Sequence, residues 1–300
     1  MEKRQLDFSK NKTQELTLED LEKTYIEDYP NGQPVGGIYH YALIQAILEK
    51  LKAAGLKPEV QQITAADNGD RQRPGVTIYK EAEAQYGVGS FESHALRRVY
   101  AIINVKDFAD KDTDYNCAIS YHQKAISVGF GPQVRVCSNM MIMGAKYFLS
   151  TTSLGSIMGK QENIKNVTEL ITKCDELLEG FSEHVVTWRE QLEQLKSVSL
   201  EVDQCRVIFS RLMEERIMYD TTNKALHKRT IYPLNDTCIK AAYERYLALV
   251  TPHSNKAITA WQFYNILNED LKPSRVDMPV LQPQMVRLND FLMKEMGIRF

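Results

Sequence analysis

Six basic and aromatic residues in the middle of this sequence form a pattern typical of proteins that bind single-stranded nucleic acid. They are Arg97, Arg98, Tyr100, Tyr121, Lys124 and Arg135. All six lie on or beside predicted strands. Basic and aromatic side chains that share one face of a sheet neutralise the phosphates and stack on the bases. The alternative is ordinary charge at the edge or on the solvent face of a sheet.

A cysteine and a histidine in the same stretch are the strongest candidates for covalent chemistry. Cys137 and His122 lie on neighbouring predicted strands, which would allow a nucleophile and its base to meet. The more ordinary interpretation is a small buried thiol and a histidine in a turn, because most free cysteines are core residues. We therefore expect no catalytic residue here.

Other familiar chemistries are absent from the sequence. The segment 155–160, GSIMGK, has three residues between its glycines where a phosphate-binding loop needs four, and Gln161 follows the lysine in place of Ser or Thr. The six histidines are scattered without metal-ligand spacing, and no GxSxG motif occurs. The sequence indicates no metal and no cofactor.

The first half of the chain predicts an antiparallel sheet with a helix packed on it. Residues 1–15 are polar and are expected to be flexible. Thr17 and Asp20 resemble a capping box, and an apolar stripe predicts a helix from about 39 to 54. Short β-branched and aromatic runs then predict strands. These runs are 59–64, 76–79, 98–105, 117–121, 125–130 and 133–137.

The second half predicts helices, beginning with one long apolar stripe. Ten apolar residues from Ile164 to Leu195 follow a 3-4-3-4 spacing through Gly180, as in a coiled coil. The stripe is expected to pack on the next helix, 200–219, as an antiparallel hairpin, with another subunit as the alternative. Further helices are predicted at 236–250, 259–270 and 284–296. The predicted class is α+β, with an α+β domain at 16–155 and a helical domain at 156–300.

Charge, cysteines and hydropathy limit the classes of protein. The 37 basic and 39 acidic residues give a net charge of −2, which argues against nonspecific duplex binding through net charge. Five widely spaced cysteines without a CxxC pair indicate reduced thiols. No stretch is apolar enough to predict a membrane span or a signal peptide. We expect a cytoplasmic protein with no membrane contact.

One segment resembles a known family. Residues 118–122 (AISYH), 126–130 (ISVGF) and 134–139 (VRVCSN) resemble the core of a family of uncharacterised phage- and plasmid-associated bacterial proteins. Residues 16–26, 37–47 and 259–265 resemble its flanking segments, so the similarity extends over about 16–270. The chain departs from the family pattern at Met140 and Met141, where many relatives have a small residue.

The resemblance implies a protein encoded by a phage or conjugative element, and it implies no particular activity. Its motif residues in this chain are His122, Cys137, Ser138 and Asn139. Arg135 and Cys137 are expected on one strand face, and Asn139 suits a turn at the strand end. A buried structural motif accounts for this pattern as well as a functional one does.

Three functions follow, in order of preference. The first is an accessory protein of a mobile element that handles nucleic acid, as a single-strand binder or annealer. The second is a protein-interaction module, such as a host- or defence-interfering factor, that binds a partner or itself through residues 164–195. The third is an enzyme that uses Cys137 and His122.

Overall fold

The computed structural model describes residues 4–28, 37–68, 74–122, 125–134, 140–151, 164, 166–222, 232–251, 256–276 and 278–298. It has the predicted α+β class, with an N-terminal antiparallel sheet and a C-terminal helical region. The sheet has six strands in the order β1-β2-β5-β6-β7-β8. Their bounds are β1 Thr13–Leu16, β2 Pro58–Ala66, β5 Arg98–Val105, β6 Thr113–His122, β7 Ala125–Val134 and β8 Phe148–Ser150.

Two smaller sheets and the helices complete the described structure. The small strands are β3 Val76–Ile78 with β4 His94–Leu96, and β9 Ser199–Leu200 with β10 Ile258–Thr259. The helices are α1 Leu18–Glu22, α2 His40–Ala53, α3 Lys80–Tyr86, α5 Val167–Glu179, α6 Phe181–Ser197, α7 Val202–Thr222, α8 Asp236–Val250, α9 Ala260–Asn268 and α10 Met278–Glu295. Short 3-10 turns are η1 Phe91–Ser93, η2 Lys106–Phe108 and η3 Ala145–Tyr147.

Helix caps explain several element boundaries. The Thr17 side chain accepts from the Asp20 backbone N–H while the Asp20 carboxylate accepts from the Thr17 N–H, which completes the predicted capping box of α1. Thr259 and Gln262 form the same arrangement at the start of α9. Gly180 separates α5 from α6, so the predicted long helix is two helices.

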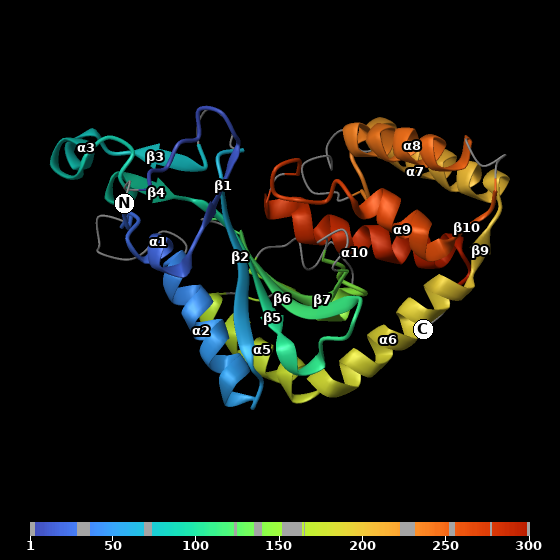
Figure 1. Cartoon of the computed structure of the whole chain (residues 1–300), viewed down its shortest axis with the longest axis horizontal. Coiled ribbons are helices and arrows are strands. Elements are labelled where there is room, and N and C mark those ends of the chain that lie inside the picture. The colour runs from blue at the N-terminus through green and yellow to red at the C-terminus, as the bar shows by residue number, and fades with distance from the viewer. Residues whose placement is uncertain are drawn as a thin grey trace.

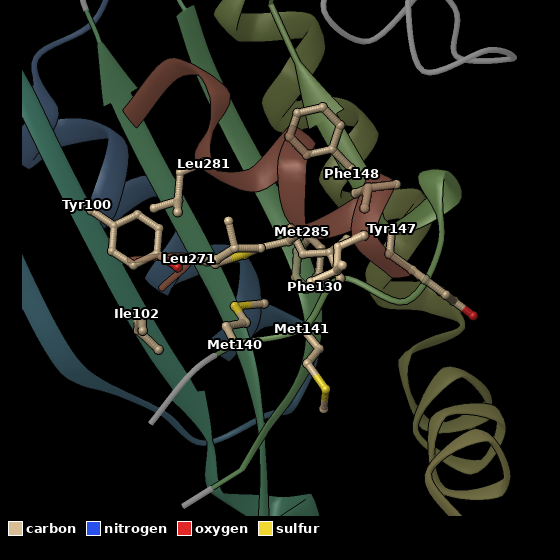
Figure 2. Close-up of a cluster of buried hydrophobic side chains, with 14 of the residues drawn as sticks. Tyr100, Ile102, Phe130, Met140, Met141, Tyr147, Phe148, Leu271, Leu281 and Met285 are labelled. Atoms are coloured by element: carbon tan, nitrogen blue, oxygen red, sulfur yellow. The ribbon is translucent and has the colours of Figure 1, made fainter. Parts of the chain in front are cut away.

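Helices cover both faces of the sheet (Figure 1). On one face lie α2, α5 and α6, whose Phe181 and Trp188 contact Phe130 and Tyr115 of the sheet. We call the opposite face, covered by α10, the α10 face. There the Gln282 side chain donates to the Ala118 carbonyl oxygen at 3.0 Å. Leu281 and Met285 of α10 lie with Met140 and Leu271 near Tyr100 (Figure 2). Residues from both halves of the chain thus share one hydrophobic core.

The packing of the 164–195 stripe differs from the prediction. Its apolar residues are buried, and α6 packs against β7 and α9, with α5 against α2 and β8. The long helical hairpin of this region is instead made by α7 and α8, which pack on each other. Leu178 is 6% exposed, so this stripe belongs to the core and is not a free interface.

The predicted break between strands 125–130 and 133–137 was also wrong. Residues 129–132, which contain two glycines and a proline and were expected to join these strands, lie inside the single strand β7. The glycines serve packing: a Cβ on Gly131 would overlap the Met141 carbonyl oxygen, and one on Gly129 would overlap the Ile142 side chain. The chain after residue 139 can therefore lie directly on the sheet.

Candidate functional site

Half of the residues proposed from the sequence can be placed. Arg97, Arg98, Tyr100, Tyr121 and His122 lie in described segments. Lys124, Arg135, Cys137, Ser138 and Asn139 lie outside the described residues.

The two tyrosines do not form a stacking platform. Tyr100 pairs with Ser120 and Tyr121 pairs with Val99 in the β5–β6 register, so the two rings project from opposite faces of the sheet. Both are buried, at 3% and 5% exposure. Burial also raises the pKa of Tyr100 above its ordinary value. The prediction that these aromatics share one exposed face is wrong, because helices cover both faces.

The two arginines are held by contacts within the chain. Arg97 binds Glu27 through two guanidinium nitrogens, with Nε to Oε2 at 2.8 Å and Nη2 to Oε1 at 2.5 Å. Arg98 is 5% exposed, and its Nη1 lies 3.5 Å from the Asn68 Oδ1. Asn68 in turn donates to the carbonyl oxygens of Pro273 and Val276. Both arginines therefore connect separate segments of the chain, which is a structural role.

A different cluster, on the α10 face, has the character of a binding site. Seven residues line a pocket of about 480 Å³: Glu59, Val60, Gln61, Asn104, Lys106, Ala109 and Asp114. The register places Glu59 opposite Asn104 and Asn104 opposite Asn116, so three strands present these side chains in one row. Asp114 and Gln133 pair in the next row of the same face. We call these residues, with Asn116 and Gln133, the amide pocket.

Asn116 fixes the orientation of the neighbouring amides. Its Nδ2 donates to Gln61 Oε1 at 3.2 Å and also to Gln133 Oε1. Because both amide hydrogens are used, the oxygen of Asn116 is defined as the remaining acceptor. A register shift between Val60 and Gln62 places Gln61 at an irregularity of β2. Bulges of this kind often redirect a side chain next to a functional site.

Two amide oxygens in this cluster are buried without a hydrogen-bond partner among the described residues. Asn104 is 8% exposed and Asn116 is fully buried, and the Oδ1 of each accepts no hydrogen bond there. A buried polar atom left unpaired costs about 1–3 kcal/mol. A bound water molecule or polar group that donates to such an atom removes this cost.

Three ion pairs involve the pocket lining or residues next to it in the chain. Lys106 pairs with Glu59, Lys57 with Asp107 at 3.5 Å, and the Arg189 Nε lies 3.9 Å from an Asp110 carboxylate oxygen. The Lys57 backbone N–H donates to the Asp107 carboxylate and lowers the pKa of that group. Turn η2 thus supplies Lys106 to the pocket lining, and its Asp107 holds Lys57 next to β2. Arg189 of α6 instead lies over the Tyr115 ring and donates to the Phe108 carbonyl oxygen, on the opposite face of the sheet.

The four described cysteines do not have the properties of catalytic thiols. Cys117, Cys174, Cys205 and Cys238 are buried, and burial raises the pKa of each, to about 12 for Cys174 and about 11 for Cys205 and Cys238. Such thiols are poor nucleophiles.

In the described segments, no group of three or more His, Cys, Asp or Glu residues is placed to hold a metal ion. Within the same segments, no helix combines the length and apolarity needed to cross a membrane.

Comparison of the chain with protein-family models, with curated proteins and with solved structures found no match in any of the three. The case for a function therefore depends on the geometry of the chain itself.

The amide pocket was not predicted from the sequence, although the sequence contains a signal of it. Asn104 lies in RVYAIINV and Asn116 in TDYNCAIS, which are otherwise strongly β-forming and apolar runs. Amides are depleted in strands and costly to bury. Two of them in the middle of neighbouring buried strands indicate a buried polar site, but pairing across strands is needed to see that they meet.

Proposed function

We propose that this protein binds single-stranded nucleic acid and that the amide pocket takes an unpaired base. The observation that carries the proposal is Asn104, which lines the pocket and whose buried amide oxygen has no partner among the described residues. This retains the nucleic-acid function favoured by the sequence and moves its site from the tyrosines to the amides. A phage or plasmid origin and a cytoplasmic location stay predictions of the sequence.

The size and chemistry of the pocket suit a nucleobase. A volume of about 480 Å³ lies within the roughly 300–1,000 Å³ range of small-molecule sites. Amide side chains recognise base edges because each carries both an acceptor and donors. An unpaired base is able to enter such a pocket, whereas a base inside a duplex stays stacked.

The cations at the rim supply a path for the phosphates. The side chains of Lys57 and Lys106 are 83% and 59% exposed. Ion pairs this exposed contribute about 0–1 kcal/mol, so a phosphate can replace the carboxylate partner at little cost. The net charge of −2 offers no long-range attraction. We therefore expect modest, salt-dependent affinity that relies on the base contacts.

The test is fluorescence anisotropy with a labelled mixed-sequence DNA strand of about 16 nucleotides, a length that spans a typical single-strand site. Asn104→Leu removes the amide and is expected to weaken binding about tenfold, since one or two hydrogen bonds are lost. Asn11→Leu, the same change at an exposed position outside the pocket lining, is the matched control. Unchanged affinity in a folded Asn104→Leu variant would refute the assignment of the site. Circular dichroism and the thermal midpoint establish that each variant is folded.

A second candidate function is self-association through the helical hairpin. Phe209, Met213, Ile239 and Tyr243 line an apolar groove of about 600 Å³ between α7 and α8. Val207 and Leu247 on the same helices are also exposed. A second copy laid across this hairpin by a two-fold axis would complete a four-helix bundle. Light scattering of wild type and Met213→Glu tests this, because a monomeric wild type excludes it.

A further inference from the structure

A second pocket, of about 420 Å³, lies beside the small sheet of β3 and β4. Its lining includes three tyrosines, two glutamates and one lysine, which are Tyr25, Tyr79, Tyr86, Glu81, Glu92 and Lys23. We call it the tyrosine pocket. It shares no lining residue with the amide pocket. Helix α3, which supplies Glu81 and Tyr86, lies at the end of the molecule opposite α7 and α8 (Figure 1).

Two of the tyrosines form a stacked pair on the small sheet. The rings of Tyr25 and Tyr79 lie with their centroids 4.1 Å apart and their planes at 27°. The Tyr25 N–H donates to the His94 carbonyl oxygen at 2.9 Å, and the Tyr79 N–H donates to the Ser93 carbonyl oxygen at 2.8 Å. Consecutive residues of the chain therefore fix both backbones, and the pair is positioned before any ligand binds.

The third tyrosine comes from a helix with unused surface. Tyr86 is 51% exposed, and α3 buries none of its seven side chains. Isolated helices this short are marginal in water, because most helical stability comes from the packing of one face. A ligand held between Tyr86 and the stacked pair would supply packing that α3 lacks.

The charge of the lining is negative. The carboxylates of Glu81 and Glu92 form no ion pair within the described part of the chain, and neither does the ammonium group of Lys23. The remaining lining residues, a glutamine and an alanine, are uncharged, so two negative charges against one positive leave a formal charge of −1. The guanidinium of Arg97, next to Tyr79, is already bound by the Glu27 carboxylate. The pocket therefore favours a cation over an anion.

From these features we propose that the tyrosine pocket binds a quaternary ammonium group. The face of an aromatic ring is electrostatically negative and attracts a cation placed within about 6 Å of its centre. A quaternary ammonium group carries no N–H, so aromatic rings satisfy it without hydrogen-bond acceptors, and the two glutamates add attraction. The volume of the pocket suits such a ligand, since small-molecule sites span roughly 300–1,000 Å³. This site goes beyond the proposed function and does not depend on it.

The probe is choline, and the readout is the tyrosine ring resonances of the full chain in an NMR titration. Neohexanol, the uncharged carbon analogue of choline, has the same shape and is the control ligand. We expect choline to bind about tenfold more tightly than neohexanol, the effect of cation–π attraction from two rings. Equal affinities would show that the pocket is only apolar and would overturn the proposal. So would the absence of choline-dependent shifts in the millimolar range.

Two charge variants separate a cation from other ligands. Glu81→Gln removes an attractive charge and is expected to weaken choline binding about threefold, whereas Lys23→Met removes a repulsive charge and is expected to strengthen it by a similar factor. Glu190→Gln, at an exposed position of α6 outside the lining, is the matched control and should leave the affinity unchanged. Stronger binding in Glu81→Gln or weaker binding in Lys23→Met would overturn the proposal.

Tyr86→Leu tests the aromatic contribution. The leucine keeps apolar surface but has no π face, so the preference for choline over neohexanol should fall about threefold. Tyr243→Leu, at an exposed tyrosine of α8, is the control. An unchanged preference in a folded Tyr86→Leu variant would contradict the cation–π basis of the site. Circular dichroism and the thermal midpoint establish that each variant is folded.

A quaternary ammonium group occurs both in free choline and in the headgroup of phosphatidylcholine. Co-sedimentation with phosphatidylcholine vesicles distinguishes these sources. Vesicle binding that free choline reverses assigns the headgroup, whereas choline binding without vesicle binding assigns the free cation, and both outcomes support the site. Failure of choline to bind leaves the proposed function in place, because the two pockets share no lining residue.

Discussion

Asn104 of β5 lies directly opposite Asn116 of β6, and both side chains are buried with an amide oxygen that has no hydrogen-bond partner among the described residues. Paired residues of antiparallel strands project from the same face with Cβ atoms about 5 Å apart. Two asparagines at such a pair stabilise a fold poorly. Their position beside a pocket explains them better as a site than as core.

Asn116 also holds the pocket together. Asn116→Ala removes the donor shared by Gln61 and Gln133 and takes this hydrogen bond from the buried Gln133 side chain. We expect the free energy of unfolding to fall by about 1–3 kcal/mol, measured by urea denaturation. Asn11→Ala, at an exposed position, is the control and is expected to change it by less than about 0.5 kcal/mol. Equal small effects in both variants would contradict the bridging role.

The salt dependence of binding tests the rim cations. A single strand loses affinity with a log–log slope of about −0.7 for each phosphate neutralised. The double variant Lys57→Ala/Lys106→Ala is therefore expected to reduce the steepness of that slope by about 1.4. Lys10→Ala/Lys240→Ala removes the same charge from exposed positions outside the pocket lining. An equal reduction in the control pair would show that only net charge matters.

Stability is expected to fall in mild acid because of His40. Burial lowers the pKa of His40 to about 4, and its Nδ1 accepts the Tyr41 backbone N–H at 2.8 Å. The unfolded chain takes up this proton near pH 6.5, so it binds more protons than the folded chain between about pH 6.5 and 4. The free energy of unfolding should then drop by about 3 kcal/mol as the pH falls through that window, and level off below it.

Replacing the imidazole tests the assignment to His40. His40→Gln cannot take up this proton, so its unfolding free energy should depend less on pH between about 6.5 and 4. His184→Gln, at a less buried imidazole, serves as the comparison and should remove a smaller part of the pH dependence. A pH dependence that survives His40→Gln unchanged would assign it to other groups.

Two glycines of β7 give a graded test of the packing. Gly131→Ala places a methyl group against the Met141 backbone oxygen, which has little freedom to move, whereas Gly129→Ala meets the end of the Ile142 side chain. Overpacking of a core costs about 1–3 kcal/mol. We expect the larger loss of thermal stability in Gly131→Ala, by scanning calorimetry. The reverse order would show that residues 141–142 do not lie on the strand.

The described cysteines predict slow thiol chemistry. Because Cys117, Cys174, Cys205 and Cys238 are buried, a Cys137→Ala variant should react with Ellman's reagent only as it unfolds. Fast reaction of that folded variant would contradict the burial. Comparison with wild type then gives the reactivity of Cys137 itself.

The amino-acid sequence determined the elements, because caps, turns and hydrophobic periodicity act over a few residues. The Thr17 and Thr259 caps, strand 98–105 and helix 236–250 follow from local pattern alone. Predictions from local sequence pattern were wrong where packing between distant segments determines the structure. Gly129 and Gly131 resemble turn residues in the sequence, but they lie in a continuous strand, where their lack of a side chain lets residues 141–142 pack on the sheet. The 164–195 stripe packs on the sheet and on α9 instead of on a coiled-coil partner.

The candidate site also depends on packing between distant segments. The sequence does not say that α10 returns to cover one face of the sheet, and this placement buries Tyr100 on that face, while the register sends Tyr121 to the other. Strand register also brings Glu59, Asn104 and Asn116 into one row from three separate segments. Sequence spacing carries no information about which strand lies beside which, so only the tertiary structure could assemble the amide pocket.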